Sequence, residues 1–420
     1  MPESFQNFFS SRRNLILLVA CVYFFSSFLQ YSFNSELKIT GFYIGLPHIY
    51  SGDEPHFLVT VHSILFDGDL ELCNNFRDAF AGGCQAGIMY SGKPEIATPC
   101  WGTQKMVSSH SVLNAFMAAS FLFPFAAEKC LLEPLAVFFT LIVSLVTIFF
   151  SLRIIEHFNF SKKITAILFL ALAFASPFWF YSKTFWSEPY LSFFLVVSLY
   201  FFLKKRFLAA GFFSAANLLI KPTSLIFSAI LFFFAFFEKK KGSSTRLFSG
   251  LAFASSLYFL VNFLLYGDAF FFSKSEQAFG GNFFSGIAAV FLAPNFGLLW
   301  TFPIFVFSAM GFWYFYKKSP KEALLFFSLF FFYAAFWALP PWILSGTGGY
   351  SFRYLAPLIP LLVVPLGFFL QENRSTFLEK LFWLLFAVSL LVNIMAALTP
   401  LLIANAPWIA LEKIFLRVFG

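Results

Sequence analysis

The chain has 420 residues, and its composition excludes an ordinary soluble domain. Hydrophobic residues make up 60% of it, 71 residues are Phe, and only 11% are charged, which leaves too little polar surface for a water-soluble fold. The apolar runs are continuous rather than alternating, which disfavours a transmembrane β-barrel. The net charge of +8 does not indicate nucleic-acid binding, because the cations lie in short loops between apolar runs.

Apolar runs of about the length that spans a bilayer recur along the chain. They predict an all-α polytopic integral membrane protein with about 11 transmembrane helices (roughly 10 to 13). Most Lys and Arg residues fall in alternate loops, beginning with Arg12 and Arg13. This asymmetry predicts a cytoplasmic N-terminus in the inner (plasma) membrane and places residues 32–111 outside. The predicted spans lie near 14–31, 134–152, 164–181, 190–203, 207–221, 223–237, 247–266, 298–316, 322–340, 354–370 and 381–403.

We interpret the chain as one integrated membrane domain, with an N-terminal module over 1–246 and C-terminal helices over 247–420. The N-terminal module includes the long outer loop 32–111 and the segment 112–127, which is apolar but short and contains Pro124. Counting this segment as a span would place the later basic loops outside. We therefore expect a juxtamembrane helix in the membrane interface, with a short true span as the alternative.

The outer loop contains adjacent acids in the stretch Gly52-Asp53-Glu54-Pro55-His56. Charge beside hydrocarbon is costly, so a pair of carboxylates there indicates a function. Residues 55–66 predict a short amphipathic helix, and Asp67-Gly68-Asp69 predicts the turn that ends it. Asp53 directly precedes this helix, so an N-cap role is its structural alternative.

Three of the five cysteines, Cys73, Cys84 and Cys100, lie in the same loop. An oxidising compartment would permit a disulfide there. The pairs Cys73–Cys84 and Cys84–Cys100 and a set of free thiols all stay open, because spacing does not fix connectivity. The sequence contains no HExxH motif and no Cys/His cluster at metal-ligand spacing, so we assign no metal ligands.

Further polar residues are predicted on the outer side. Glu188 lies between two spans, shortly after Lys183, and the two would either form an ion pair or contact a polar ligand. Lys221 ends a short span and either snorkels toward water or contacts a ligand. Residues 346–354 combine glycines with Arg353. Such a loop can bring backbone N–H groups and a guanidinium to a phosphate.

The order of these motifs resembles the GT-C glycosyltransferases, which are integral membrane enzymes that use polyprenyl-phosphate sugars. Asp53-Glu54 is similar to their acidic signature after the first span, and the nearest branch contains protein O-mannosyltransferases, aminoarabinose transferases and lipopolysaccharide galacturonosyltransferases. At Ser108-Ser109-His110 some relatives have an acid and a Lys instead, which leaves metal dependence open. Other similar stretches follow in order: Tyr181-Ser182-Lys183 with Ser187-Glu188-Pro189, Gly211 with Lys221-Pro222, Ala293-Pro294-Asn295-Phe296-Gly297-Leu298-Leu299, and Gly348-Gly349-Tyr350-Ser351-Phe352-Arg353-Tyr354.

The resemblance implies a membrane glycosyltransferase, either a hexosyl- or a pentosyltransferase, that works with inversion. It would move a sugar from a polyprenyl-phosphate donor to a lipid, glycan or protein acceptor on the periplasmic side. Asp53 would be the general base, with Glu54 orienting it or the acceptor. No cofactor is required, although a divalent cation is compatible with this reading. Arg353, Lys183, Lys221 and His110 would hold the donor phosphate, and Glu188, His56 and Tyr354 would contact the substrates.

A lipid-linked-sugar flippase or another membrane transporter is the alternative function. Transporters usually contain internal repeats or helices broken near the midplane of the membrane. We find no repeat in this sequence, and its charged residues concentrate in the loops. The enzyme is therefore the favoured reading. The identities of the sugar and of the acceptor stay open, as does the oligomeric state.

Overall fold

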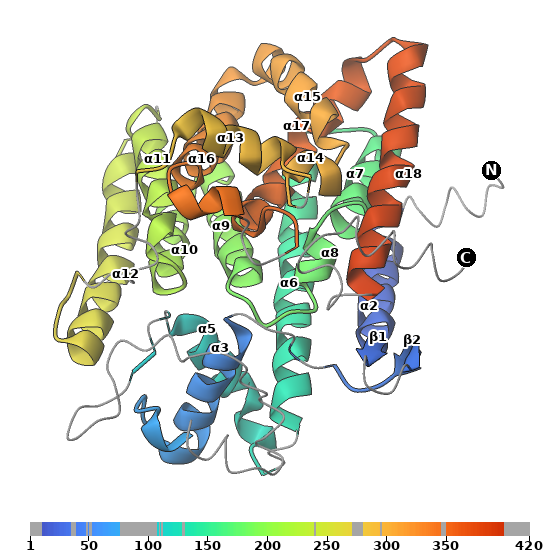
Figure 1. Cartoon of the computed structure of the whole chain (residues 1–420). Coiled ribbons are helices and arrows are strands. Elements are labelled where there is room, and N and C mark those ends of the chain that lie inside the picture. The colour runs from blue at the N-terminus through green and yellow to red at the C-terminus, as the bar shows by residue number, and fades with distance from the viewer. Residues whose placement is uncertain are drawn as a thin grey trace. The chain divides into compact units, whose positions relative to one another are not determined.

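Helices dominate the described part of the chain (Figure 1). The computed structural model describes residues 11–34, 39–47, 49, 53–75, 107–108, 110, 112–127, 131–238, 241–270, 280–294, 296–345 and 350–398. Its longer elements are α2 (Arg12–Phe28), β1 (Leu29–Asn34), β2 (Ile39–Ile44), α3 (Glu54–His62), α5 (Leu113–Leu122), α6 (Leu132–His157), α7 (Lys162–Phe174), α9 (Glu188–Leu203), α10 (Phe207–Ala216), α11 (Leu225–Phe236), α12 (Ser243–Tyr266), α13 (Phe283–Leu292), α15 (Phe305–Lys318), α16 (Pro320–Trp337), α17 (Ile359–Glu372) and α18 (Thr376–Leu398).

Every predicted span overlaps one of these helices, so the all-α class is confirmed. Within the described ranges, five helices are long and apolar enough to cross a membrane. The number of spans stays a prediction, because several apolar helices are shorter. The five are Leu132–His157, Ser243–Tyr266, Pro320–Trp337, Arg353–Glu372 and Thr376–Leu398.

A small β-hairpin, which the sequence pattern did not predict, follows α2. Strands β1 and β2 pair antiparallel, with Leu29 opposite Ile44 and Asn34 opposite Ile39. It is the only sheet among the described residues. The apolar run near 14–31 was assigned wholly to the first span, whereas the helix ends at Phe28. Continuous hydrophobicity does not distinguish the last turn of a helix from the start of a buried strand.

The helices belong to two compact units, each assembled from separated segments of the chain. The first unit contains residues 1–45, 144–183 and 279–420, and the second contains residues 46–143 and 184–278. The helix α6 therefore contributes its first part to the second unit and its remainder to the first.

The first unit is built around α17, whose residues are almost all buried. Helices α15, α7 and α16 contact it. The backbones of α15 and α17 approach so closely that a Cβ added at Gly311 would lie 1.9 Å from the carbonyl oxygen of Pro365. A small residue on α15 is what permits this contact, as in other membrane helix pairs.

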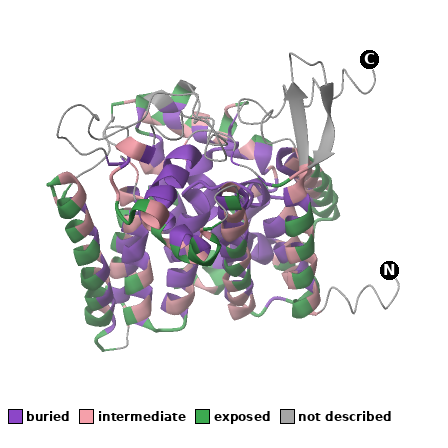
Figure 2. Ribbon diagram, turned by 90° about the horizontal axis from the view of Figure 1, so that it is seen from below, coloured by how far each residue is buried: buried purple, intermediate pink, exposed green. Residues whose placement is uncertain are grey.

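In the second unit, α10 packs against both α9 and α12. The outer side of α12 remains apolar and exposed, which suits contact with lipid rather than water. Figure 2 shows several such helices, with exposed and buried residues along different sides. The exposed apolar residues of α12 include Phe248, Phe253, Leu260, Phe263 and Leu264.

The two juxtamembrane helices of the second unit pack on each other. The buried side chains of α3 and α5 share one hydrophobic cluster that includes Phe57, Val61, Ala118 and Leu122. The predicted helix 55–66 is present as α3 followed by a π-turn (Ser63–Asp67), and Gly68 ends it with a φ of 72°. The turn predicted at Asp67-Gly68-Asp69 is therefore confirmed.

The segment 112–127 forms α5 and a short 3₁₀ turn (Phe123–Phe125). Together they are about 20 Å long, which is too short for the ~30 Å hydrocarbon core. One side of α5 is buried, whereas Phe116 and Phe123 are exposed. This shape supports the predicted interface helix over a full span.

Candidate active site

The predicted site residues all lie in described parts of the chain, but they divide between the two units. The second unit holds Asp53, Glu54, His56, His110, Glu188 and Lys221, and the first holds Lys183, Arg353 and Tyr354.

Asp53 occupies the N-cap position of α3, but its side chain makes no capping hydrogen bond. Its backbone oxygen accepts from the Phe57 N–H at 3.3 Å. The helix is started instead by Pro55, whose fixed φ suits the first helical turn. The capping alternative for the Asp53 side chain is therefore not supported, and the carboxylate does not serve to satisfy the helix end.

Glu54 is fully buried, and its Oε1 accepts a hydrogen bond from the Phe185 N–H at 2.6 Å. A carboxylate held by a backbone N–H in a buried position fixes α3 against the segment that leads into α9. The two adjacent acids thus differ: Glu54 is anchored to the backbone, and Asp53 stands one residue before the helix.

His56 and His110 form a pair of rings beside these acids. Their ring centroids are 5.1 Å apart, and the His110 ring also lies 5.3 Å from that of Phe57. Burial, helped by the neighbouring His110, lowers the pKa of His56 to about 4, although Asp53 acts in the opposite direction. His56 is therefore a neutral imidazole at pH 7, able to donate or accept one hydrogen bond at each nitrogen according to its tautomer.

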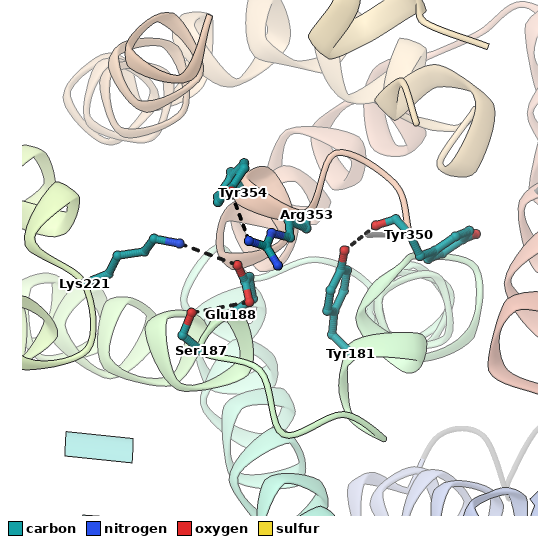
Figure 3. Close-up of polar contacts among 7 residues, drawn as sticks. All are labelled: Tyr181, Ser187, Glu188, Lys221, Tyr350, Arg353 and Tyr354. Atoms are coloured by element: carbon teal, nitrogen blue, oxygen red, sulfur yellow. Dashed lines mark hydrogen bonds and ion pairs between the residues drawn. The ribbon is translucent and has the colours of Figure 1, made fainter. Parts of the chain in front are cut away.

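Glu188 begins α9, and its carboxylate pairs with Lys221. The Lys221 Nζ lies 3.8 Å from Glu188 Oε1, and the Ser187 hydroxyl lies 3.4 Å from Oε2 (Figure 3). Only 1% of the Glu188 side chain is exposed, so the pairing offsets a large desolvation cost. The sequence left open an ion pair between Glu188 and Lys183, but the structure gives each of these residues a different partner.

Lys183 is buried in the first unit and donates to backbone carbonyls. Its Nζ hydrogen-bonds the Ser26 oxygen at 2.6 Å and also the Ala397 oxygen. Burial lowers the pKa of Lys183 to about 7. The Lys183 amino group thereby links α2 to α18.

Arg353 opens the turn before α17 and is held against aromatic rings. Its Nη2 donates to the Tyr354 hydroxyl at 3.0 Å (Figure 3), and its Cζ lies 4.8 Å from the Tyr354 ring centroid. The Tyr354 ring in turn stacks on Trp337, with centroids 3.9 Å apart. This support fixes the plane of the guanidinium, a group whose fork of N–H donors matches the geometry of an anion.

Two residues from other parts of the chain hold the backbone beside Arg353. They are Tyr181, from the motif that contains Lys183, and Asn393, from the last predicted span. The Tyr181 hydroxyl donates to the Tyr350 carbonyl (Figure 3), and the Tyr350 hydroxyl lies 3.1 Å from Asn393 Oδ1. Ser351 has a φ of 56°, an uncommon conformation for a residue with a side chain. Its hydroxyl lies 2.7 Å from that of Thr301. The glycines at 346–349 are outside the described residues.

The cysteine prediction is resolved in part. Cys73 is disulfide-bonded, whereas Cys21 is free and exposed. Cys84, Cys100 and Cys130 lie outside the described residues. Within the described ranges, no group of three or more His, Cys, Asp or Glu side chains is arranged to hold a metal ion.

Sequence reasoning missed several polar residues that organise these sites. Asn393, in the last span, donates to the Thr301 and Ser389 carbonyls at 2.9 and 2.7 Å. Ser192 and Asn217 are fully buried in the second unit. Their signal was available, because a polar residue within an apolar span is costly unless it has a purpose.

No protein-family model matches the sequence, and no curated protein matches it. Its fold, however, is similar to those of solved proteins. ArnT from Cupriavidus metallidurans bound to undecaprenyl phosphate superposes with a TM-score of 0.58 at 14% identity, covering 96% of this chain and 72% of that one. The apo form of ArnT gives a TM-score of 0.56 at 15% identity, covering 87% of this chain.

The oligosaccharyltransferase of Archaeoglobus fulgidus has the same fold, with a TM-score of 0.52 at 12% identity, and 94% of this chain is covered. This chain spans 60% of the apo ArnT chain and 55% of the oligosaccharyltransferase. The resemblance to the GT-C superfamily is thus confirmed at the level of the fold.

Proposed function

We propose that the protein is a membrane glycosyltransferase that takes its sugar from a polyprenyl-phosphate donor. The fold is shared with ArnT, which has been captured with undecaprenyl phosphate. The transfer would occur on the periplasmic side, with inversion at the anomeric carbon. The acceptor is a hydroxyl or an amine of a lipid, a glycan or a protein.

The observation that carries this proposal is the state of Asp53. Asp53 directly precedes the buried helix α3 in the predicted outer loop, and its side chain does not cap that helix. Glu54 beside it is fixed by a backbone N–H, so the two acids are suited to different tasks. Asp53 is the general base that takes the proton from the acceptor, and Glu54 is a positioning residue.

The leaving phosphate is a stable anion, so it needs cations rather than an acid. Arg353 is the first candidate for this role, because Tyr354 and Trp337 hold its planar guanidinium in place. Lys183 has two of its donors on carbonyls, and Lys221 is paired with Glu188. We rank both below Arg353, and His110 follows them.

His56 and Tyr354 remain proposed substrate contacts. A neutral His56 can hydrogen-bond an acceptor hydroxyl without forming an ion pair with the Asp53 carboxylate. A requirement for a divalent cation stays a prediction, to be tested by chelation. Disulfide bonding of Cys73 supports the placement of the outer loop in an oxidising compartment.

The test is Asp53→Asn, which keeps the size of the side chain but removes the base. Turnover in membranes that contain the purified donor lipid should fall by about 10²–10⁴-fold. Binding of the donor should be nearly unchanged, because the substitution does not remove a cation.

Asp69→Asn is the matched control in the same loop. The Asp69 carboxylate accepts from the Ser63 hydroxyl and the Glu71 N–H at the end of α3, so its loss should cost stability rather than turnover per folded molecule. If the Asp53→Asn variant keeps wild-type turnover, Asp53 is excluded as the base.

A further inference from the structure

The second unit contains a polar cluster around an interruption between α10 and α11. We call residues 217–224 the α10–α11 break. It consists of a 3₁₀ turn (Asn217–Leu219), an extended Lys221 with φ −159° and ψ 121°, and a second turn (Pro222–Ser224). The first turn follows α10 directly and the second leads into α11, so the helical backbone is interrupted at the extended Lys221. Pro222 beside it cannot donate a backbone hydrogen bond.

Two contacts fix this break against the first turns of α9. Asn217 Nδ2 donates to the Leu191 carbonyl at 3.2 Å, and Lys221 Nζ lies 3.8 Å from Glu188 Oε1. Within the break, the Lys221 backbone N–H donates to the Asn217 backbone carbonyl oxygen at 2.9 Å. The break and α9 therefore form one local structure that includes the Glu188 carboxylate.

Several buried polar atoms in this structure have no hydrogen-bond partner among the described residues. They are Ser192 Oγ, Asn217 Oδ1, Thr223 Oγ1 and Ser224 Oγ. Ser192, Asn217 and Ser224 are fully buried, and Thr223 is 8% exposed. Ser192 lies one turn after Glu188 on the same side of α9. Buried polar atoms are normally paired, so their concentration here indicates a polar occupant.

The depth of the break strengthens this argument. The arm Phe207–Leu219 is about 21 Å long, which is shorter than the ~30 Å hydrocarbon core. Exposed basic residues precede α10 and follow α11, at 204–206 and at Lys241. If both ends lie at one membrane surface, the break lies within the hydrocarbon depth. Irregular backbone is tolerated at that depth only where it is buried in protein or lines a polar cavity.

The chemistry of the cluster selects the occupant. The three hydroxyls can donate and accept hydrogen bonds, and the amide oxygen and the carboxylate accept them, which matches the hydroxyl groups of a sugar. A phosphate fits poorly, because Glu188 would repel it and already neutralises Lys221. We propose that Ser192, Asn217, Thr223 and Ser224, with Glu188, bind the hydroxyl groups of the sugar on the lipid-linked donor. This assignment rests on the proposed function and names the part of the donor that the break recognises.

The test compares donor lipids that differ only in their sugar. The full-length protein in detergent is titrated with undecaprenyl phosphate and with a panel of undecaprenyl-phosphate hexoses and pentoses, and binding is followed by native mass spectrometry. The wild type should bind at least one sugar-bearing lipid more tightly than the bare phosphate. In Ser192→Ala and Thr223→Val that sugar-bearing lipid should bind about tenfold more weakly, and the bare phosphate should bind as before.

Ser198→Ala is the control on the same helix. The Ser198 hydroxyl is also buried but donates to the Ala210 carbonyl at 2.7 Å. Its loss should lower the unfolding midpoint of the ligand-free protein without changing sugar preference. Thr223→Val should leave that midpoint unchanged or raise it, because the hydroxyl it removes has no partner.

Two results would overturn the proposal, and they separate it from the proposed function. If the wild type prefers a sugar-bearing lipid and both variants keep that preference, the sugar subsite is wrong while the proposed function stands. If the wild type binds no lipid of the panel, the proposed function fails and the sugar assignment fails with it.

Discussion

At the scale of single residues, His56 makes the stability of the outer loop dependent on pH. Its pKa falls from 6.5 to about 4, chiefly because the ring is buried, and its neighbour His110 adds to the effect. Between these two values the unfolded chain binds more protons than the folded chain. The free energy of unfolding therefore rises with pH through this window, and it falls on acidification.

We predict that acidification from pH 7.5 to pH 5 lowers the free energy of unfolding by about 2 kcal/mol through His56 alone. His56→Gln should remove this part of the pH dependence, because glutamine does not titrate. Thermal unfolding in detergent across this range measures the effect. An unchanged slope in His56→Gln would contradict the assignment.

The sequence predicted which residues carry charge near the site, but not how each is held. Asp53 and Glu54 were identified as a pair, because acids beside an apolar span are unusual. Their different states depend on the Phe185 N–H, which is distant in sequence and carries no side-chain signal. Lys183 and Glu188 were considered as partners from spacing alone. Side-chain reach is compatible with many partners, so spacing could not select among them.

At the scale of elements, the glycine before the basic-Pro motif has a packing explanation. A Cβ at Gly211 would lie 2.1 Å from the Leu247 carbonyl oxygen, and one at Gly250 would lie 2.2 Å from the Leu208 oxygen. Each glycine thus admits the backbone of the other helix, and α10 and α12 meet without side chains between them. This contact positions the end of α10, where the α10–α11 break begins.

We predict that Gly211→Ala destabilises the protein by about 1–3 kcal/mol, because the added methyl must displace the α12 backbone. The sign is informative, since alanine normally stabilises a helix by up to about 1 kcal/mol relative to glycine. The unfolding midpoint in detergent should fall. Ser249→Ala, at an exposed position of α12, should change it little. A higher midpoint for Gly211→Ala would show that the two helices are not in such close contact.

Hydrophobic length located the helices but not their ends or interruptions. The predicted spans 207–221 and 223–237 overlap α10 and α11. They could be located because lysines flank the pair and Lys221-Pro222 separates its two members. The turns at 217–219 and 222–224 were not predicted, since their residues continue the apolar composition of the helices. The hairpin after Phe28 was missed for the same reason.

At the scale of the whole molecule, the orientation in the membrane is the premise of the proposed chemistry. The asymmetry of Lys and Arg between alternate loops predicts it, and α12 offers a direct way to measure it. This helix is about 36 Å long, enough to cross the bilayer. Exposed residues flank it, with Lys241 before its first turn and Asp268 after its last. We therefore expect the two ends of α12 to lie on opposite sides of the membrane.

We predict that Asp268→Cys and Leu46→Cys react with a membrane-impermeant maleimide in intact cells, whereas Lys241→Cys reacts only after permeabilisation. Leu46 is 56% exposed and lies shortly before Asp53, so it reports the side of the proposed base. Each substitution is made in a Cys21→Ala background, which removes the exposed free thiol. The Cys21→Ala protein without a further substitution measures the labelling of the remaining cysteines. Protection of Leu46→Cys in intact cells would place Asp53 in the cytoplasm, where a donor presented on the periplasmic side does not reach it.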